Sequence, residues 1–324
     1  MRAVQITQTG GPEVLQLADV PLAEPAFGEV VVRHRAIGVN FIDVYHRTGL
    51  YTQPLPLVLG TEGAGVVEAV GAGVTHVTVG DRVAYATVKP GSYADARIVD
   101  GKHVVRLPDA IDFTIAAGMM LKGLTVQYLL HRTSHRLEAG DHCVWHAAAG
   151  GVGLIACQWA SALGYQVIAT AGSKEKCDLA LAHGASHAID YRTEDVVARV
   201  KEITGGAKVK AVFDPVGKDT WDRSLDCLAP FGLMVSFGNA SGAVPAIELG
   251  QLMQKGALYV TRPSLGTHTA DGEVTRQMAA DLFAVVTNGS VKINVEQTYA
   301  LADVAQAHRD LEARVTTGST VLLP

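Results

Sequence analysis

The sequence predicts a two-domain α/β protein, in which a doubly wound parallel sheet is combined with a β-rich, barrel-like domain. The length of 324 residues exceeds what one ordinary core needs. About the first 120 residues hold short β-branched runs with little helix between them, which is typical of a barrel or sandwich. From about Asp141, strand-like and helix-like segments alternate, and repeating βα units imply a parallel sheet.

Strands dominate the first region, where β-branched runs are bounded by glycine and proline. The apolar spacing then changes to a helical period over Thr114–His131. The predicted strands are Glu29–Gly38, Gly63–Val70, Gly80–Ala86 and Tyr93–Val99.

The alternating region is expected to end at Ala257–Thr261, a β-rich stretch that would form the edge strand of the sheet. The strands predicted before it are His142–His146, Gln166–Ala171, Ala188–Asp190, Ala211–Asp214 and Gly232–Phe237, and the helices are Val152–Leu163, Lys174–His183, Thr193–Thr204 and Trp221–Leu228.

The C-terminal segment does not extend this alternation, so we return it to the first domain. It holds two predicted helices, Glu273–Thr287 and Ala302–Arg314, and a terminal strand, Ser319–Leu323. The predicted domains are therefore 1–124 with 264–324, and 125–263.

Composition and charge narrow the class of protein. The chain is 48% hydrophobic and 18% charged, as in globular proteins, and its formal net charge is −5 without a block of like charges. The visible charges offer no basic patch, which argues against nucleic acid or an anionic membrane as a partner.

Targeting features and cysteines indicate the compartment. The N-terminal residues have no apolar signal-peptide core, and no apolar run reaches the roughly 18 residues that span a bilayer. The four cysteines are far apart, which is typical of reduced thiols. We therefore expect a cytoplasmic protein that does not enter a membrane.

A glycine-rich turn between a predicted strand and a predicted helix predicts a Rossmann dinucleotide site. His146–Gly153 matches G-x-G-x-x-G with Ala148 at the first position. Gly150 would let the backbone approach a pyrophosphate, and Gly153 would allow close packing of the helix on the strand. The N–H groups of the helix start, which includes Gly151 and Val152, would face the anion. A tight turn without a ligand is the alternative.

The end of the next strand favours NADPH over NADH. An acidic residue about 20 residues beyond the turn would bind the ribose 2′-hydroxyl of NADH. The chain instead has Ser173, Lys174 and Lys176, which suit a 2′-phosphate. Glu175 is the competing acid, but it lies beyond the strand tip. A solvated lysine pair is the alternative interpretation.

Several motifs together resemble one family along essentially the whole chain. NFIDVYHRTGLY at Asn40–Tyr51, LGTEGAG at Leu59–Gly65, LKGLT at Leu121–Thr125 and the turn HAAAGGVG are similar to zinc-independent quinone oxidoreductases of the medium-chain dehydrogenase/reductase superfamily. This resemblance implies a GroES-like catalytic domain beside the Rossmann domain, and a homodimer whose sheet continues across the subunits.

The same resemblance implies that the site holds no metal. Zinc alcohol dehydrogenases of this superfamily have Cys and His ligands where this chain has Asn40 and Thr61, and neither replaces a thiolate or an imidazole. No cysteine precedes Cys143, so a four-cysteine zinc lobe is absent. The nearest histidine pair, His131 and His135, lacks a third ligand and is interpreted as surface residues.

The resemblance also assigns the remaining site residues. Asn40 and Tyr45 would line the nicotinamide side of the pocket, with Tyr51 on the adjoining loop, although a packing role for Tyr51 stays open. Arg314 would help to hold the 2′-phosphate, although an arginine late in a helix also favours the helix dipole. The other residues implied to contact the cofactor are Thr125, Tyr128, Tyr191, Phe237, Gly238, Arg262 and Ser264.

These observations predict an NADPH:quinone oxidoreductase. Without a Lewis acid, hydride is delivered most readily to acceptors that delocalise the incoming charge, as quinones do. An NADPH-dependent reductase of alkenals or enones is the first alternative. An NADPH-binding structural or RNA-binding protein is the alternative from another class.

Overall fold

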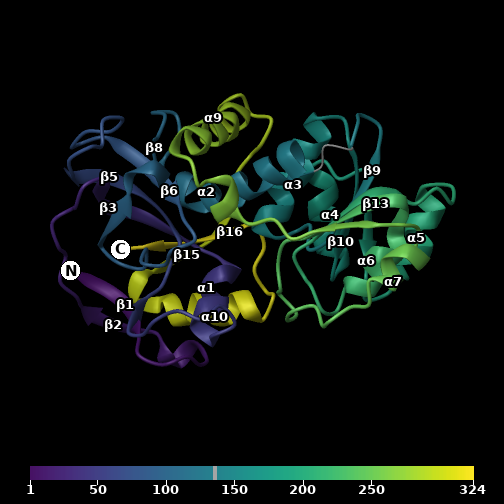
Figure 1. Cartoon of the computed structure of the whole chain (residues 1–324), viewed down its shortest axis with the longest axis horizontal. Helices are drawn as coiled ribbons and strands as arrows, with labels where there is room; N and C mark the ends of the chain where they lie inside the picture. The colour runs from purple at the N-terminus through teal and green to yellow at the C-terminus, as the bar shows by residue number, and fades with distance from the viewer. Residues whose placement is uncertain (134–136) are drawn as a thin grey trace. The chain divides into compact units, whose positions relative to one another are not determined.

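The computed structural model describes residues 1–133 and 137–324, and the chain divides into two compact units. Unit 1 comprises Met1–Thr125, Leu265–Asn288 and Ile293–Pro324, and unit 2 comprises Val126–Ser264 and Gly289–Lys292 (Figure 1). The segment Gly289–Lys292, which the sequence assigned to the first domain, groups with unit 2. There the Gln158 side chain accepts from Lys292 N at 2.8 Å and donates to Lys292 O at 3.0 Å.

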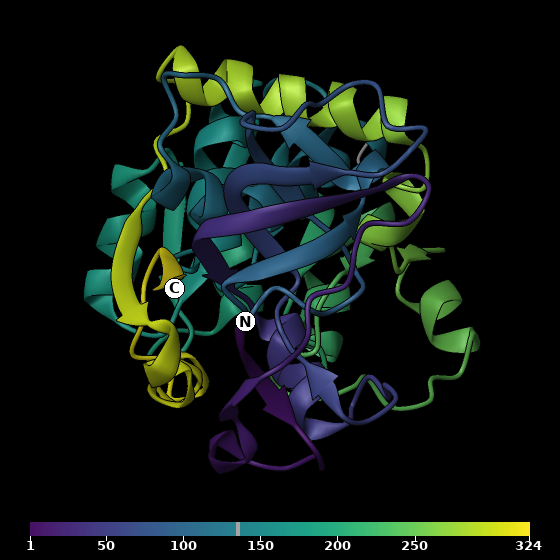
Figure 2. The ribbon, with the colours of Figure 1, turned by 90° about the vertical axis from the view of Figure 1, so that its left-hand side faces the viewer.

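Unit 1 is built on a seven-stranded sheet of order β15-β16-β3-β5-β6-β8, with β7 paired to β3, and on a smaller sheet of order β2-β1-β4. Valines of the large sheet pack together with the Tyr85 ring in a fully buried cluster. Helix α9 lies against β8, along one side of this sheet (Figure 2). The strands are β1 Arg2–Ile6, β2 Gln16–Asp19, β3 Glu29–Val39, β4 Leu57–Val58, β5 Glu62–Val70, β6 Arg82–Ala86, β7 Ala96–Asp100, β8 Val104–Arg106, β15 Val295–Ala300 and β16 Ser319–Leu323, and the helices are α1 Phe41–Thr48, α2 Phe113–Tyr128, α8 Leu265–His268, α9 Gly272–Thr287 and α10 Val304–Glu312. Helix α2 ends in unit 2, because the boundary between the units falls after Thr125.

Unit 2 is a six-stranded, wholly parallel sheet of order β11-β10-β9-β12-β13-β14. The order reverses at β9, so this is the doubly wound Rossmann arrangement that the alternating pattern predicted, and the prediction is confirmed. The strands are β9 His142–Trp145, β10 Gln166–Ala171, β11 His187–Asp190, β12 Val209–Asp214, β13 Leu228–Ser236 and β14 Tyr259–Thr261, and the helices are α3 Gly151–Ala162, α4 Lys174–Ala182, α5 Val196–Ile203, α6 Trp221–Cys227 and α7 Gly250–Gln254.

Part of the segment between the first two predicted strands forms a helix, α1. Helix α1 begins after Asn40, whose backbone N–H is bound by Asp43, and ends at Gly49, which takes a left-handed φ of 82°. A run of eight residues is too short for its hydrophobic periodicity to distinguish a helix from a loop. The residues that indicate a helix here are its N-cap and C-cap, Asn40 and Gly49.

One long apolar helix bears on the expectation that no segment spans a membrane. Phe113–Thr133, which is α2 with the π-helical turn Leu129–Thr133, is long and apolar enough to cross a bilayer, with a mean hydropathy of 1.3 in its most apolar window. However, 78% of that window is buried inside the protein. Its apolar side chains therefore serve the core, as those of a buried helix do.

Candidate functional site

Asn40 stands at the junction of β3 and α1, where the chain changes from strand to helix. The Asn40 N–H donates to Asp43 Oδ2 at 2.9 Å, and the Asp43 N–H donates to Asn40 O at 3.0 Å. These reciprocal bonds satisfy backbone groups that a helix start leaves open. The Asn40 side chain is only 5% exposed, so its amide must find partners within the protein.

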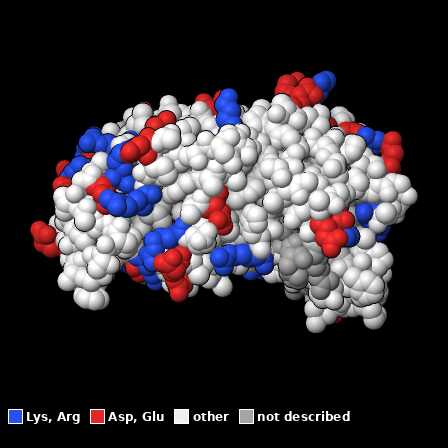
Figure 3. Space-filling view, turned by 90° about the horizontal axis from the view of Figure 1, so that it is seen from above, with Lys and Arg blue, Asp and Glu red and all other residues white. Residues whose placement is uncertain are grey.

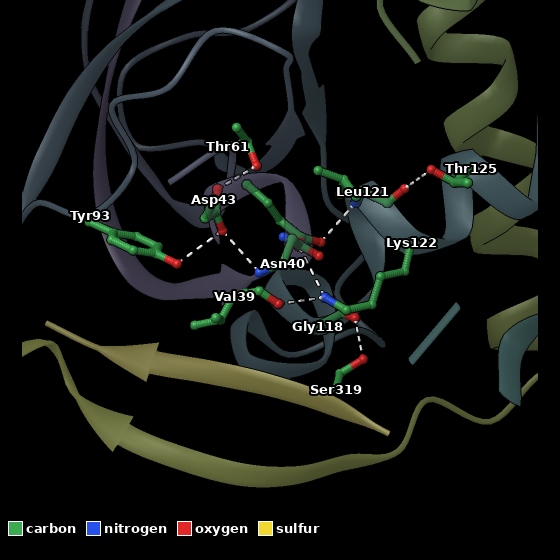
Figure 4. Close-up of polar contacts among 11 residues, drawn as sticks. Val39, Asn40, Asp43, Thr61, Tyr93, Gly118, Leu121, Lys122, Thr125 and Ser319 are labelled. Atoms are coloured by element: carbon green, nitrogen blue, oxygen red, sulfur yellow. Dashed lines mark hydrogen bonds and ion pairs between the residues drawn. The ribbon is translucent and has the colours of Figure 1, made fainter. Parts of the chain in front are cut away.

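The Asn40 amide binds a buried carboxylate. Asn40 Nδ2 donates to Glu62 Oε2 at 2.7 Å, and the Leu121 N–H donates to Glu62 Oε1 at 2.8 Å. Lys122 Nζ lies 3.4 Å from Glu62 Oε2 and also 3.4 Å from the Val39 carbonyl oxygen. Figure 4 shows that Asn40, at the β3–α1 junction, lies close to Leu121 and Lys122, which belong to α2. Sequence reasoning did not single out Glu62 or Lys122.

Thr61 is bound to a second buried carboxylate. Thr61 Oγ1 donates to Asp43 Oδ1 at 3.1 Å, and the Tyr93 hydroxyl donates to Asp43 Oδ2 at 2.9 Å (Figure 4). Burial raises the pKa of the Asp43 carboxyl to about 7, although the bonds from Asn40, Tyr93 and Thr61 act in the opposite direction.

The Asp43 contacts continue into a chain of buried polar groups. His308 Nδ1 lies 3.1 Å from Arg47 Nη1, which can only donate, so His308 Nε2 carries the proton and donates to the Tyr93 oxygen at 3.0 Å. Burial lowers the pKa of His308 to about 3, which keeps the ring neutral. Arg47 makes a bidentate pair with Glu312 at 2.8 Å for both bonds. The network thus ties α1 to α10.

Tyr45 and Tyr51 form an aromatic pair beside Asn40 in sequence. Their ring centroids are 5.2 Å apart at 66°, and the Tyr51 N–H donates to Tyr45 O at 3.0 Å. Tyr45 is 8% exposed and Tyr51 is half-buried. Unit 1 therefore brings these two predicted site residues together, and Thr125 also belongs to this unit, where its hydroxyl donates to Leu121 O at 2.7 Å.

In unit 2, the glycine-rich turn has the form that a dinucleotide site requires. Gly150 is the N-cap of α3, and no side chain among the described residues caps that helix. The N–H groups of Gly151, Val152 and Gly153 lie in the first turn of this helix, where they are predicted to face a pyrophosphate. A Cβ on Gly153 would overlap the Ala148 backbone, whereas a Cβ on Gly150 would lie 3.3 Å from the Ala147 carbonyl oxygen. Sterics thus demand glycine at 153 rather than at 150.

Several residues predicted to contact the adenosine end of the cofactor lie near the turn that follows β10. Ser173 is the N-cap of α4 and accepts from the Lys176 N–H at 3.3 Å. The Tyr191 hydroxyl would lie 2.6 Å from a Cβ added to Gly172, so it packs against this turn. Lys174 instead pairs with Asp178 at 2.6 Å and is 80% exposed, so it resembles a solvated helix lysine.

The ends of β13 and β14 carry further predicted cofactor residues. Arg262 Nη1 donates to Ser236 Oγ and to Gly238 O, both at 2.9 Å, and so braces the turn after β13. The Phe237 ring lies 5.8 Å from that of Trp145. Tyr128 and Ser264 also lie in unit 2, whereas Arg314 follows α10 in unit 1, so its role at the phosphate stays a prediction.

A buried network in unit 2 was missed by sequence reasoning. Ser224 Oγ donates to Asp214 Oδ2 at 2.7 Å and lies 3.0 Å from His146 Nε2, while His146 Nδ1 lies 2.8 Å from Thr170 Oγ1. Asp214 Oδ1 accepts from the Val216 N–H at 2.7 Å. The network joins the carboxyl ends of β9, β10 and β12. The sequence could have indicated it, because each of these predicted strands has a polar residue at or next to its end and parallel strands end at the same edge of a sheet.

The donor set at Asn40 and Thr61 does not fit zinc. The Asn40 amide nitrogen and the Thr61 hydroxyl both donate to carboxylates, and neither is a thiolate or an imidazole. Among the described residues, no group of three or more His, Cys, Asp or Glu side chains could hold a metal ion. The four cysteines lie in unit 2 and are buried. His135 of the histidine pair lies outside the described residues.

Two family descriptions match the chain. The Alcohol dehydrogenase GroES-like domain family matches residues 26–135, and the Zinc-binding dehydrogenase family matches residues 151–282. The first match confirms the GroES-like domain, and the second falls mainly on the parallel sheet. The donor set above departs from the metal that the second description names.

Three known proteins are similar over their full lengths. A quinone oxidoreductase of Pseudomonas aeruginosa is 56% identical, covering 100% of this chain and 99% of the relative. The crystal structure of Escherichia coli quinone oxidoreductase complexed with NADPH superposes with a TM-score of 0.98 at 50% identity, covering 100% of both chains. A 2-haloacrylate reductase of a Burkholderia species is 41% identical, covering 99% of this chain and 98% of the relative.

The buried Asp43 carboxyl generates a prediction about stability. Its pKa of about 7 exceeds the ordinary value of 3.8, so the folded state binds more protons than the unfolded state between these pH values. The stability of the native protein relative to Asp43→Asn should therefore fall as pH rises from about 4 to about 7, by up to about 4 kcal/mol. Urea unfolding across this range measures it, with Asp109→Asn as the control for an exposed carboxyl. A difference that grows with pH would contradict the prediction.

Proposed function

The chain belongs to the quinone oxidoreductase family of the medium-chain dehydrogenase/reductase superfamily, and from this membership we propose that it reduces quinones with NADPH and without a metal. The observation that carries the proposal is the donor set at Asn40 and Thr61, an amide and a hydroxyl bound to carboxylates. It occurs in a chain that is 56% identical to a quinone oxidoreductase along its whole length.

Unit 2 supplies the residues that would hold the cofactor. NADPH, when bound, supplies the hydride for the reduction. The free N–H groups at the start of α3 suit its pyrophosphate, and Ser173, Lys176 and Tyr191 at the tip of β10 suit its 2′-phosphate and adenosine end. Arg262 holds the turn after β13, which the cofactor is proposed to follow.

Unit 1 supplies the residues that would orient the acceptor. The Asn40 amide would hydrogen-bond a carbonyl group, and the rings of Tyr45 and Tyr51 would form an aromatic wall. Orientation and exclusion of water are the main contributions of such a site. A reduced quinone oxygen takes its proton from water, so no single side chain has to act as an essential acid.

A second candidate substrate class has one observation in its favour. The relative from Burkholderia is a 2-haloacrylate reductase, and acrylates carry a carbon–carbon double bond conjugated to a carbonyl. Enones and alkenals share this conjugation with quinones and need the same hydride geometry. The RNA-binding alternative receives less support, because acidic and basic side chains are interspersed on the face shown in Figure 3.

The assembly proposed for this function is a cytoplasmic homodimer. Strand β14 ends the sheet of unit 2, and its apolar Tyr259 and Val260 are 46% and 39% exposed. A strand at the edge of a sheet is a template for pairing, and pairing with a second copy would give a two-fold interface.

Turnover with matched acceptor panels tests the function. NADPH oxidation should be faster with 1,4-quinones than with enones or 2-haloacrylates, because the quinone delocalises the incoming charge onto oxygen. Steady-state kcat/KM for each acceptor, measured with EDTA present, gives the ranking. Faster reduction of the enone panel would favour the second candidate, and no turnover of either panel would reject both.

The cofactor preference gives a second prediction for this subsection. Lys176→Ala should raise the KM for NADPH by roughly ten- to a hundredfold, since a charge-assisted hydrogen bond contributes about 1.5–3 kcal/mol. The KM for NADH should change little, because NADH lacks the 2′-phosphate. Lys174→Ala is the matched control, because it removes an 80% exposed lysine from the same helix. Equal use of both cofactors by the native protein would contradict the assignment.

The edge strand gives a prediction about assembly. Light scattering at micromolar concentration should give twice the mass of the chain, and Val260→Asp should shift it toward the monomer by placing a carboxylate in the proposed interface. Val315→Asp, at a 67% exposed valine in unit 1, is the control and should stay dimeric. A monomeric native protein would end the proposal.

A further inference from the structure

Glu62 is a fully buried carboxylate that the steps above do not use. It pairs with Gly38 in the register of β3 and β5, and a side chain on Gly38 would overlap the Glu62 carboxylate and the Ala117 carbonyl. Gly38 therefore leaves the space that the carboxylate fills. A buried charge is costly unless it is paired and hydrogen-bonded, and here Lys122 and the Leu121 N–H meet that requirement.

The chemistry of this contact fixes which way the Asn40 amide faces. An ionised carboxylate only accepts hydrogen bonds, so the group that lies 2.7 Å from Glu62 Oε2 must be the Asn40 NH₂. The Asn40 carbonyl oxygen then points away from Glu62. One Nδ2 hydrogen is engaged by Glu62, and the side-chain oxygen faces the Asp43 N–H in the capping box of α1, which leaves the second Nδ2 hydrogen for other partners.

We propose that Glu62 is a positioning residue that holds the Asn40 amide in the orientation used for hydride transfer, with Lys122 as its countercharge. The inference rests on the proposed function, in which Asn40 contacts the acceptor or the nicotinamide. Each of these presents a carbonyl group. A flipped amide would turn the Asn40 oxygen toward Glu62 and would change which hydrogen bonds the reacting groups receive.

Substitution of Glu62 by glutamine tests the proposal while keeping the shape of the side chain. The single oxygen of the introduced amide can satisfy either the Leu121 N–H or the Asn40 NH₂, but not both at once. Because the Leu121 N–H is held in the backbone and Lys122 keeps the Val39 carbonyl oxygen as an acceptor, the introduced NH₂ should face Asn40 and force its amide to flip. We expect Glu62→Gln to lower kcat for quinone reduction about tenfold, the cost of one misplaced hydrogen bond, and the Kd for NADPH to change less.

Two further variants guard against a merely structural effect. Glu62→Gln leaves Lys122 buried without its countercharge, so Glu62→Gln/Lys122→Met restores a neutral cluster and should keep the loss in kcat while regaining thermal stability. Glu68→Gln is the matched control on the same strand. Its carboxylate pairs with Arg33 at the surface, so we expect native kcat.

A double-mutant cycle shows whether Glu62 acts through Asn40. In an Asn40→Ala background, Glu62→Gln should cost less than about twofold in kcat, because its target is already gone. An equal loss in both backgrounds would overturn the proposal, as would native kcat in Glu62→Gln.

A spectroscopic readout separates this inference from the proposed function. With ¹⁵N-labelled asparagine, the Asn40 amide signal is identified by its loss in Asn40→Ala. One of its protons should be shifted downfield by the carboxylate and should lose that shift in Glu62→Gln. If the native protein reduces no quinone, the proposed function fails while this spectrum still tests the orientation. An Asn40 signal that is unchanged in Glu62→Gln would overturn the inference, even if quinone turnover is normal.

Discussion

The hydrogen bonds accepted by the Asp43 carboxylate set the geometry on which unit 1 depends. One oxygen holds Thr61 at the start of β5, and the other holds both the first turn of α1 and the Tyr93 hydroxyl. Through Tyr93 the same carboxylate reaches His308 on α10. Removal of this acceptor would leave several buried donors without a partner, which costs more than any one hydrogen bond contributes. The hydrogen bond to Asp43 therefore fixes the Asn40 backbone within the protein itself, without a contribution from a ligand.

In both units, a buried carboxylate accepts hydrogen bonds from several secondary-structure elements and so holds them together. In unit 1, the carboxylates of Asp43 and Glu62 organise donors from β3, α1 and α2. In unit 2, the Asp214 carboxylate organises Ser224 and, through it, His146, at the carboxyl ends of three parallel strands. In both cases, a buried acceptor is satisfied by donors from separate elements, so the loops that carry functional residues are fixed by the core rather than by their own sequence.

Asn40 and Thr61 are not metal ligands, so the buried carboxylates near them are balanced by protein groups rather than by a metal ion. A zinc site would place a dication beside these residues, and the local carboxylates would balance it. Here the positive charge near Glu62 comes from the Lys122 ammonium, at 3.4 Å, and the buried Asp43 carries a raised pKa. The site is therefore rich in hydrogen bonds among buried polar groups. Such an environment suits acceptors that stabilise their own developing charge, as quinones do.

The sequence by itself determined the alternating pattern of the parallel sheet, the turn that ends at Gly153, and the amide and hydroxyl at Asn40 and Thr61. The sheet pattern and the turn are local features, read from neighbouring residues and their period, whereas Asn40 and Thr61 were identified through the resemblance to a family. The short helix α1 was not predicted from the sequence, because eight residues show too little hydrophobic periodicity. Only the tertiary structure decided that Asn40 meets Glu62, 22 residues away, and that Tyr93 meets His308, 215 residues away. The partners of buried polar groups depend on which elements the fold packs together, and no local pattern records that packing.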